Sequence, residues 1–159
     1  MNANLHTSSA IPRSALSWTF DLLQDGEPQV EVVVNSFREK GFVRIRSKEY
    51  RVHREGLLTG PFVLVDGLRT VATADKPSAF KRRLDIDFER RRFVFKADSA
   101  FYRAMTLYEN DAPIGSIEPQ SAFSRKADLH LPDDLPQALQ GFLLWLTLVL
   151  WRRQQESSS

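Results

Sequence analysis

Seven basic residues gather in and beside one expected pair of strands, and these side chains are the best suited in the sequence to hold a ligand. They are Lys76, Lys81, Arg82, Arg83, Arg90, Arg91 and Arg92. The strands are "FKRRLDIDF" and "RFVFKA", joined through "ERR". Arginine presents a planar fork of N–H donors that matches phosphate. We therefore expect an anion-binding face here. The alternative is a solvated strand surface of mixed charge.

The charge of the whole chain supports the same expectation. The formal net charge is only +2, but the segment 38–103 holds 17 Lys or Arg against 9 Asp or Glu, and the remainder holds 5 against 11. A basic middle predicts one positive face if the fold gathers these residues together. Such a face attracts the phosphates of lipid or of nucleic acid.

Asp85 and Asp87 form one candidate pair of carboxylates. Their spacing of two places both on one face of a strand, about 7 Å apart at a rise of roughly 3.3 Å per residue. Such a pair suits a cation or acid–base work. The interpretation that we favour is that both balance Lys81, Arg83 and neighbouring strand arginines in cross-strand pairs.

No other pattern in the sequence indicates catalysis. His6, His53 and His130 are far apart and show no metal-ligand spacing. The glycine-rich phosphate loop, the dinucleotide fingerprint and the nucleophile elbow are absent. We therefore expect a non-enzymatic protein without a catalytic residue, metal or cofactor. Nucleic acid is a disfavoured partner, because the one expected helix is apolar and supplies no recognition surface.

Short alternating runs predict that the chain from Trp18 to Leu131 forms about ten to twelve antiparallel strands. Asp25-Gly26 and Asp66-Gly67 are hairpin signals between such runs. Regular short strands with frequent turns favour a sandwich or a barrel. The chain has 159 residues, a length typical of one domain. We expect a disordered arm over residues 1–15, one domain over 16–154 and a disordered tail over 155–159.

The C-terminal sequence "LPDDLPQALQGFLLWLTLVLWRR" predicts one helix over residues 135–153. Asp133 or Asp134 is expected to cap its start, with Pro136 in the first turn. Phe142 to Trp151 is apolar on every face but spans only ten residues, whereas a membrane span needs about 20. We therefore expect a buried helix inside a closed or nearly closed barrel, rather than a membrane anchor or an oligomer seam.

This pattern resembles the tubby C-terminal-like superfamily, which includes tubby domains, phospholipid scramblases and the LURP-one-related proteins. The resemblance covers residues 18–153 and rests on the β-rich chain with one apolar terminal helix. The cadence of "VATADKPSAFKRRLDIDFERRRFVFKADSAFYRAMTLYENDAPIGSI" is also similar. It implies a twelve-stranded barrel around a central helix, and lipid binding or lipid movement as an activity.

Together these patterns lead to two main hypotheses about function; a third, a ligand-binding barrel or enzyme, is disfavoured because the central helix would occupy the space that a ligand needs. The first is a non-enzymatic barrel that binds anionic lipid head groups or phosphorylated ligands through its basic face. The second is a structural or adaptor protein that binds another protein without affinity for lipid. The chain has no cysteine and no apolar leader, so we expect a cytoplasmic protein, peripheral at the membrane under the first hypothesis.

Overall fold

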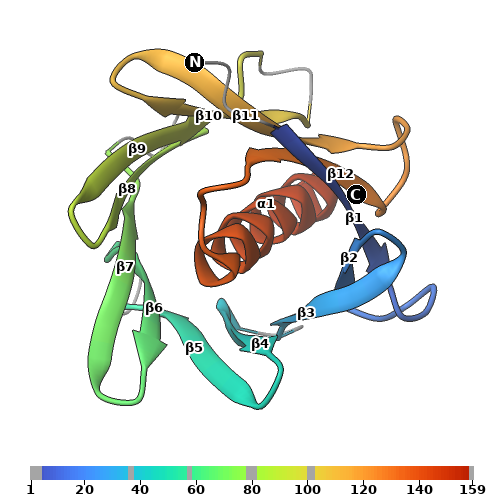
Figure 1. The fold of residues 1–159 in the computed structure, drawn as a ribbon, viewed down its shortest axis with the longest axis horizontal. Helices are drawn as coiled ribbons and strands as arrows, with labels where there is room; N and C mark the ends of the chain where they lie inside the picture. Colours follow the sequence, from blue (N-terminus) through green and yellow to red (C-terminus); the bar gives the residue numbers. More distant parts are fainter. Residues whose placement is uncertain (1–4, 36–37, 57–58, 78–81, 100–102, 158–159) are drawn as a thin grey trace.

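The computed structural model describes residues 5–35, 38–56, 59–77, 82–99 and 103–157. The chain is a closed antiparallel barrel of twelve strands with one helix inside the ring (Figure 1). The strands are β1 (Leu5–Pro12), β2 (Thr19–Gln24), β3 (Glu27–Val34), β4 (Lys40–Ile45), β5 (Lys48–Arg54), β6 (Phe62–Asp66), β7 (Arg69–Asp75), β8 (Arg83–Phe88), β9 (Arg91–Lys96), β10 (Met105–Glu109), β11 (Ala112–Pro119) and β12 (Ala127–Pro132), and the helix is α1 (Gln137–Ser157). The expected fold class is confirmed.

The strands form a meander in which each strand pairs with its neighbours in sequence, and β1 pairs with β12 to close the ring. Asp25 and Gly26 form a two-residue turn in which both φ angles are positive, at 53° and 78°. That geometry favours Asp-Gly at a hairpin tip, as expected. The second Asp-Gly signal is shifted by one residue, because Asp66 ends β6 and Gly67 opens the turn.

The interior follows from the alternation of the strands. In β3, Val30, Val32 and Val34 are buried while the residues between them are partly exposed. In β8, Leu84, Ile86 and Phe88 are buried in the same way. Successive side chains of a strand point to opposite faces, so a strand with this alternation presents one apolar row to the lumen.

The helix α1 fills that lumen. Every residue from Ala138 to Arg152 is buried, which requires cover on all sides. Polar side-chain groups within residues 142–151 have backbone partners: Trp145 Nε1 donates to the Val33 carbonyl oxygen at 3.1 Å, Thr147 Oγ1 to the Leu143 carbonyl oxygen at 2.8 Å and Trp151 Nε1 to the Arg103 carbonyl oxygen at 2.8 Å. The expected buried helix is thus confirmed. Among the described residues, no helix is long and apolar enough to span a membrane.

The boundaries of α1 differ from those expected. The helix begins at Gln137 and reaches Ser157, so it includes most of the segment expected to be a disordered tail. Residues 158–159 lie outside the described part of the chain. Asp133 pairs with His6 and Asp134 pairs with Arg91, so both carboxylates link the start of the helix to strands instead of serving as the expected caps.

The expectation of a disordered arm over residues 1–15 is wrong for Leu5–Pro12, which forms β1. This strand lies between β12 and β2 and closes the barrel. Its inward positions are the small residues Ser8 and Ala10, so the sequence lacks the apolar alternation that marks the other strands. Hydrogen bonds to two neighbours hold β1 in place. Residues 1–4 lie outside the described chain.

The meander gives the barrel two different ends. The connections after β2, β4, β6, β8 and β10 are two-residue turns, and α1 starts on the same side; we call this the turn end. The connections after β1, β3, β5, β7, β9 and β11 have five to eight residues, and α1 finishes among them; we call this the loop end.

Candidate anion-binding site

The structure does not bring the six described basic candidates together. Lys76 and Arg82 lie in the connection at the loop end, and Arg83 begins β8 there. The sequence triplet Arg90, Arg91 and Arg92 lies at the turn end, at the other end of β8. A six-residue strand is about 20 Å long. Lys81 lies outside the described residues.

Carboxylates neutralise most of the candidates in the β8–β9 hairpin. Arg83 pairs with Asp85 at 3.0 Å, and Arg92 pairs with Asp87 at 3.2 Å. The pair of Asp87 with Arg92 confirms the expected cross-strand pairing, whereas Arg83 and Asp85 pair within the single strand β8. Surface pairs of this kind stabilise little, but they reduce the charge available to an anion.

Arg91 is the most strongly paired of the candidates. Its guanidinium donates two hydrogen bonds to Glu109, at 2.9 and 2.8 Å, and a third to Asp134 at 3.1 Å. The hydrogen bonds to Glu109 raise the pKa of Arg91, and the same bonds lower the pKa of the Glu109 carboxyl. Because its charge is shared with two carboxylates, Arg91 is a structural link between β9, β10 and the start of α1.

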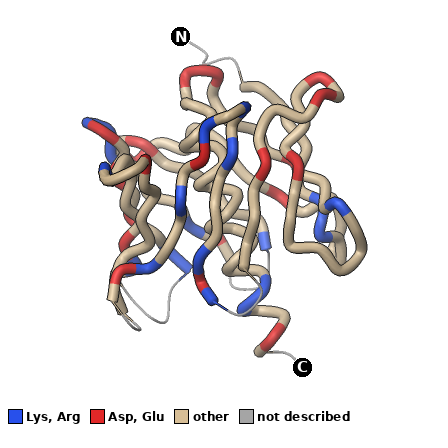
Figure 2. The backbone as a smooth tube through the Cα atoms, turned by 90° about the horizontal axis from the view of Figure 1, so that it is seen from below, with Lys and Arg blue, Asp and Glu red and all other residues tan. Residues whose placement is uncertain are grey.

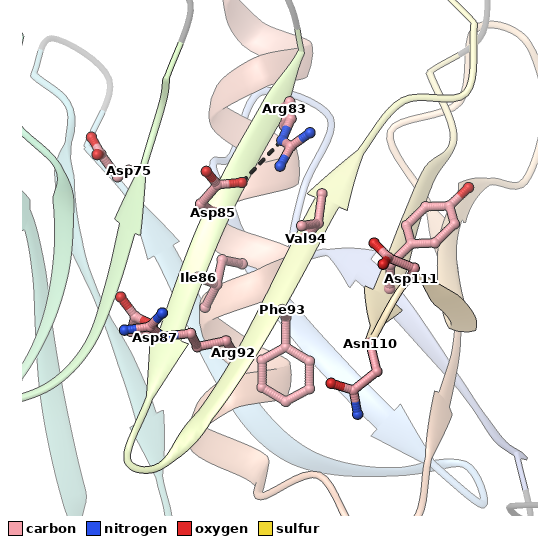
Figure 3. A pocket seen from close by; sticks show the side chains of 11 residues that line it. Asp75, Arg83, Asp85, Ile86, Asp87, Arg92, Phe93, Val94, Asn110 and Asp111 are labelled. Carbon is pink, nitrogen blue, oxygen red and sulfur yellow. Dashed lines mark hydrogen bonds and ion pairs between the residues drawn. The ribbon is translucent and has the colours of Figure 1, made fainter.

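The outer face of this hairpin carries a shallow hollow of about 470 Å³ (Figure 3). Asp75 lies directly opposite Asp85 across β7 and β8, and Asp87 and Asp111 also line the hollow. Four acidic residues against two arginines make it a poor anion site. In the described part of the chain, no group of three or more His, Asp or Glu side chains is arranged to hold a metal ion.

The charge of the described residues divides between the two ends of the barrel. At the loop end, the connections and the last turns of α1 hold nine Lys or Arg against four Asp or Glu. At the turn end, the connections hold two against five. Figure 2 shows basic residues around the final turns of the helix, at the lower side of the view. The positive face is therefore an end of the barrel and not the strand surface that we expected from the sequence.

A cavity of about 420 Å³ opens at the loop end, where α1 leaves the barrel. We call it the arginine–tryptophan pocket and define it by Trp18, Arg103, Phe123, Arg125 and Trp151, which are part of its lining. The Arg103 guanidinium lies 4.6 Å from the ring centre of Trp151, and that of Arg125 lies 5.0 Å from the ring centre of Trp18. At this distance a guanidinium cation and the face of an indole ring attract each other.

The hydrogen bonds of the two pocket arginines go to backbone oxygens in the described chain. Arg103 donates to the carbonyls of Ser121 and Ser124, at 3.0 and 2.8 Å. Arg125 donates to the carbonyls of Ala15 and Ser17. The Arg125 Nε atom is buried and makes no hydrogen bond within the described residues. Backbone oxygens hold the guanidinium groups in place without cancelling their charge.

The pKa values distinguish the two pocket arginines from Arg91. Burial lowers the pKa of both Arg103 and Arg125, with no compensating effect from a carboxylate. Glu109 has the opposite effect on Arg91, whose pKa is raised. Both residues are partly buried, and a partly buried cation without a counter-charge is less favourable than a solvated one in the ligand-free protein. A bound anion would therefore compensate positive charge in this pocket.

A second group of cations lies on the loop-end rim. Arg54 pairs with Glu39 at 3.0 Å, and Arg153 pairs with the same carboxylate. Burial lowers the pKa of Lys76, and the charges of Arg153 and Arg54 lower it further. Three cations thus share one carboxylate. Of the described candidates predicted from sequence, Lys76 joins this group, and Arg82 also lies at this end, donating to the Ser99 carbonyl oxygen at 2.7 Å.

Sequence reasoning missed the pocket residues because they come from separate segments. Trp18 ends the connection after β1, Arg103 lies in the connection after β9, Phe123 and Arg125 in the connection after β11, and Trp151 in α1. The one local signal was "AFSRK", an aromatic residue next to basic residues in a loop.

Comparisons of the chain with protein-family models, with curated proteins and with solved structures find no match. The twelve strands and the enclosed helix are compatible with the tubby-like barrel architecture, and the resemblance rests on those features.

Proposed function

We propose that the protein is a non-enzymatic barrel that binds anionic membrane surfaces through its loop end and acts as a peripheral membrane protein. The observation that carries this proposal is the opposite charge of the two ends. Nine basic against four acidic residues at the loop end, and two against five at the turn end, would orient the barrel axis toward a negative surface.

Exposed apolar side chains at the loop end add to the electrostatic attraction. Leu16 is 91% exposed and Phe123 is 97% exposed. Arg125 connects their two loops through its hydrogen bonds to Ala15 and Ser17. Burial of one such side chain in a membrane interface contributes up to roughly 1.5–3 kcal/mol.

Exposed apolar side chains alone would not determine which end of the barrel faces the membrane. Leu5 and Leu68 are exposed at the turn end, where the net charge is negative. Single exposed apolar residues are common on proteins of any function. The coincidence of Leu16 and Phe123 with the net positive charge is what favours the loop end.

The experiment compares two triple variants that change the net charge by the same amount. Arg38, Lys40 and Lys126 are exposed at the loop end and are reversed to Glu in the first variant. The second reverses three exposed basic residues at the turn end, Arg69→Glu, Arg90→Glu and Arg92→Glu. Binding is measured by co-flotation with vesicles of phosphatidylcholine with and without phosphatidylserine.

The loop-end variant should bind anionic vesicles at least about a hundredfold more weakly, since each basic residue near the surface contributes about 1 kcal/mol. The turn-end variant should bind as well as the unaltered protein. Salt should weaken the binding, because the Debye length falls from about 10 Å at 0.1 M to about 3 Å at 1 M. Equal losses in both variants, or no binding to anionic vesicles at low salt, would reject the proposal and favour a protein partner.

A further inference from the structure

We infer that the arginine–tryptophan pocket binds a single anionic amphiphile, a molecule with a carboxylate or phosphate head on a short apolar body. This inference goes beyond the proposed function, because it concerns one small molecule and requires no membrane surface. The head group would be held by Arg103 and Arg125, and the body would lie on the apolar lining between them and the helix.

The charge of the pocket selects an anion. Arg103 and Arg125 are both in the lining, and no carboxylate of the described chain is part of it. Their hydrogen bonds to the Ser121, Ser124, Ala15 and Ser17 carbonyls explain why the guanidinium groups are ordered, but leave two positive charges uncompensated. A bound oxyanion would supply that compensation through charge-assisted hydrogen bonds.

The other side chains that line the pocket favour a ligand with an apolar body. Phe20, Leu148 and Trp151 belong to the core, and the pocket reaches all three. Phe123 extends the apolar wall to the solvent edge, where it is 97% exposed. A cavity of about 420 Å³ falls within the range that holds small ligands. An inorganic oxyanion would leave most of this apolar wall in contact with water.

The pocket lies at one end of the barrel, outside the lumen that α1 occupies. The helix α1 fills the lumen, so that space is closed to a ligand. The pocket lies where α1 leaves the loop end, and its polar lining includes Gln154 and Gln155 from the last turns of the helix. A ligand there contacts α1 and the connections after β1, β9 and β11 together.

Binding is measured by isothermal titration calorimetry on the full chain, below the micelle concentration of each ligand. The probes are decyl phosphate and decanoate, with decyl glucoside as the neutral amphiphile and inorganic phosphate as the head alone. Both anionic amphiphiles should bind at least tenfold more tightly than decyl glucoside and inorganic phosphate. Equal affinity for the neutral and anionic chains would overturn the role of the arginines, and equal affinity for inorganic phosphate would overturn the role of the apolar wall.

Arg103→Gln removes one charge and keeps an amide donor for the loop carbonyls, and should weaken decyl phosphate binding at least tenfold. Arg51→Gln is the matched control, because Arg51 also donates to a loop carbonyl, that of Gly67 at 2.9 Å, but at the turn end. If Arg103→Gln fails to fold, Phe123→Ala provides the test at a site exposed to solvent, where a loss of severalfold is expected. Unchanged affinity in the folded variants would refute the inference.

The triple variants of the vesicle experiment leave Arg103, Arg125 and Phe123 unchanged. The two proposals can therefore be refuted independently of each other. A protein that binds decyl phosphate but ignores anionic vesicles would retain the pocket and lose the membrane surface. A protein that binds vesicles but shows no preference for decyl phosphate would lose the pocket and retain the surface.

Discussion

Gly141 allows a direct test of how tightly the barrel encloses its helix. A Cβ atom at this position would lie 2.4 Å from Val43 Cγ1 and 3.2 Å from Val30 Cγ1. Carbon atoms pack best at about 3.5–4.0 Å, so the first contact is too close by more than 1 Å. Val43 is buried and β-branched, and its side chain has little freedom to move away.

Two opposing effects decide the outcome of Gly141→Ala. Alanine is better than glycine in a helix interior by about 1 kcal/mol. Overpacking in a closed core costs about 1–3 kcal/mol. The net effect in the unaltered barrel should be a destabilisation of ~0–2 kcal/mol.

Val43→Ala removes the atom responsible for the clash, and only the milder contact with Val30 remains. In that background Gly141→Ala should stabilise the protein, by up to about 1 kcal/mol. The predicted interaction energy between the two sites is about 1–3 kcal/mol, a size typical of residues in contact. The midpoints and slopes of urea unfolding of the four proteins measure it. The same effect of Gly141→Ala in both backgrounds would show that the helix is not enclosed as tightly as described.

Two further predictions concern the ion pair between Arg91 and Glu109 and the strand β1. Glu109→Gln should lower the free energy of unfolding by about 0.5–1 kcal/mol at neutral pH. This value allows for the partial exposure of the Arg91–Glu109 pair. Because the folded pKa of Glu109 is lowered by Arg91, this stabilisation is present above the unfolded pKa of about 4.3 and disappears as the pH falls through the folded value. The free energies of unfolding of the variant and the parent, measured with urea, should therefore converge in acid. A difference that stays constant with pH would contradict this. Deletion of residues 1–12 should expose the edges of β2 and β12 and cause aggregation in size-exclusion chromatography, and a monodisperse folded product would show that β1 is dispensable.

Much of the fold could be predicted from local patterns. Alternating apolar residues determine a strand with one inward face, and Val30, Val32 and Val34 illustrate this in β3. The apolar run from Phe142 to Trp151 requires burial on all sides, which only a surrounding sheet could supply in a chain with one expected helix. The strand β1 could not be predicted in this way, because Ser8 and Ala10 point inward and carry no strong apolar signal.

The sequence alone thus determined the barrel, the enclosed helix and an excess of positive charge in the middle of the chain. Only the tertiary structure decided which of those charges remain uncompensated. Arg91 is neutralised by Glu109 and Asp134, which lie 18 and 43 residues away, whereas Arg103 and Arg125 meet backbone oxygens and indole rings. The reason is that charge pairing depends on strand register and on which loops share an end of the closed barrel, and both are set by contacts between distant segments rather than by neighbours in the sequence.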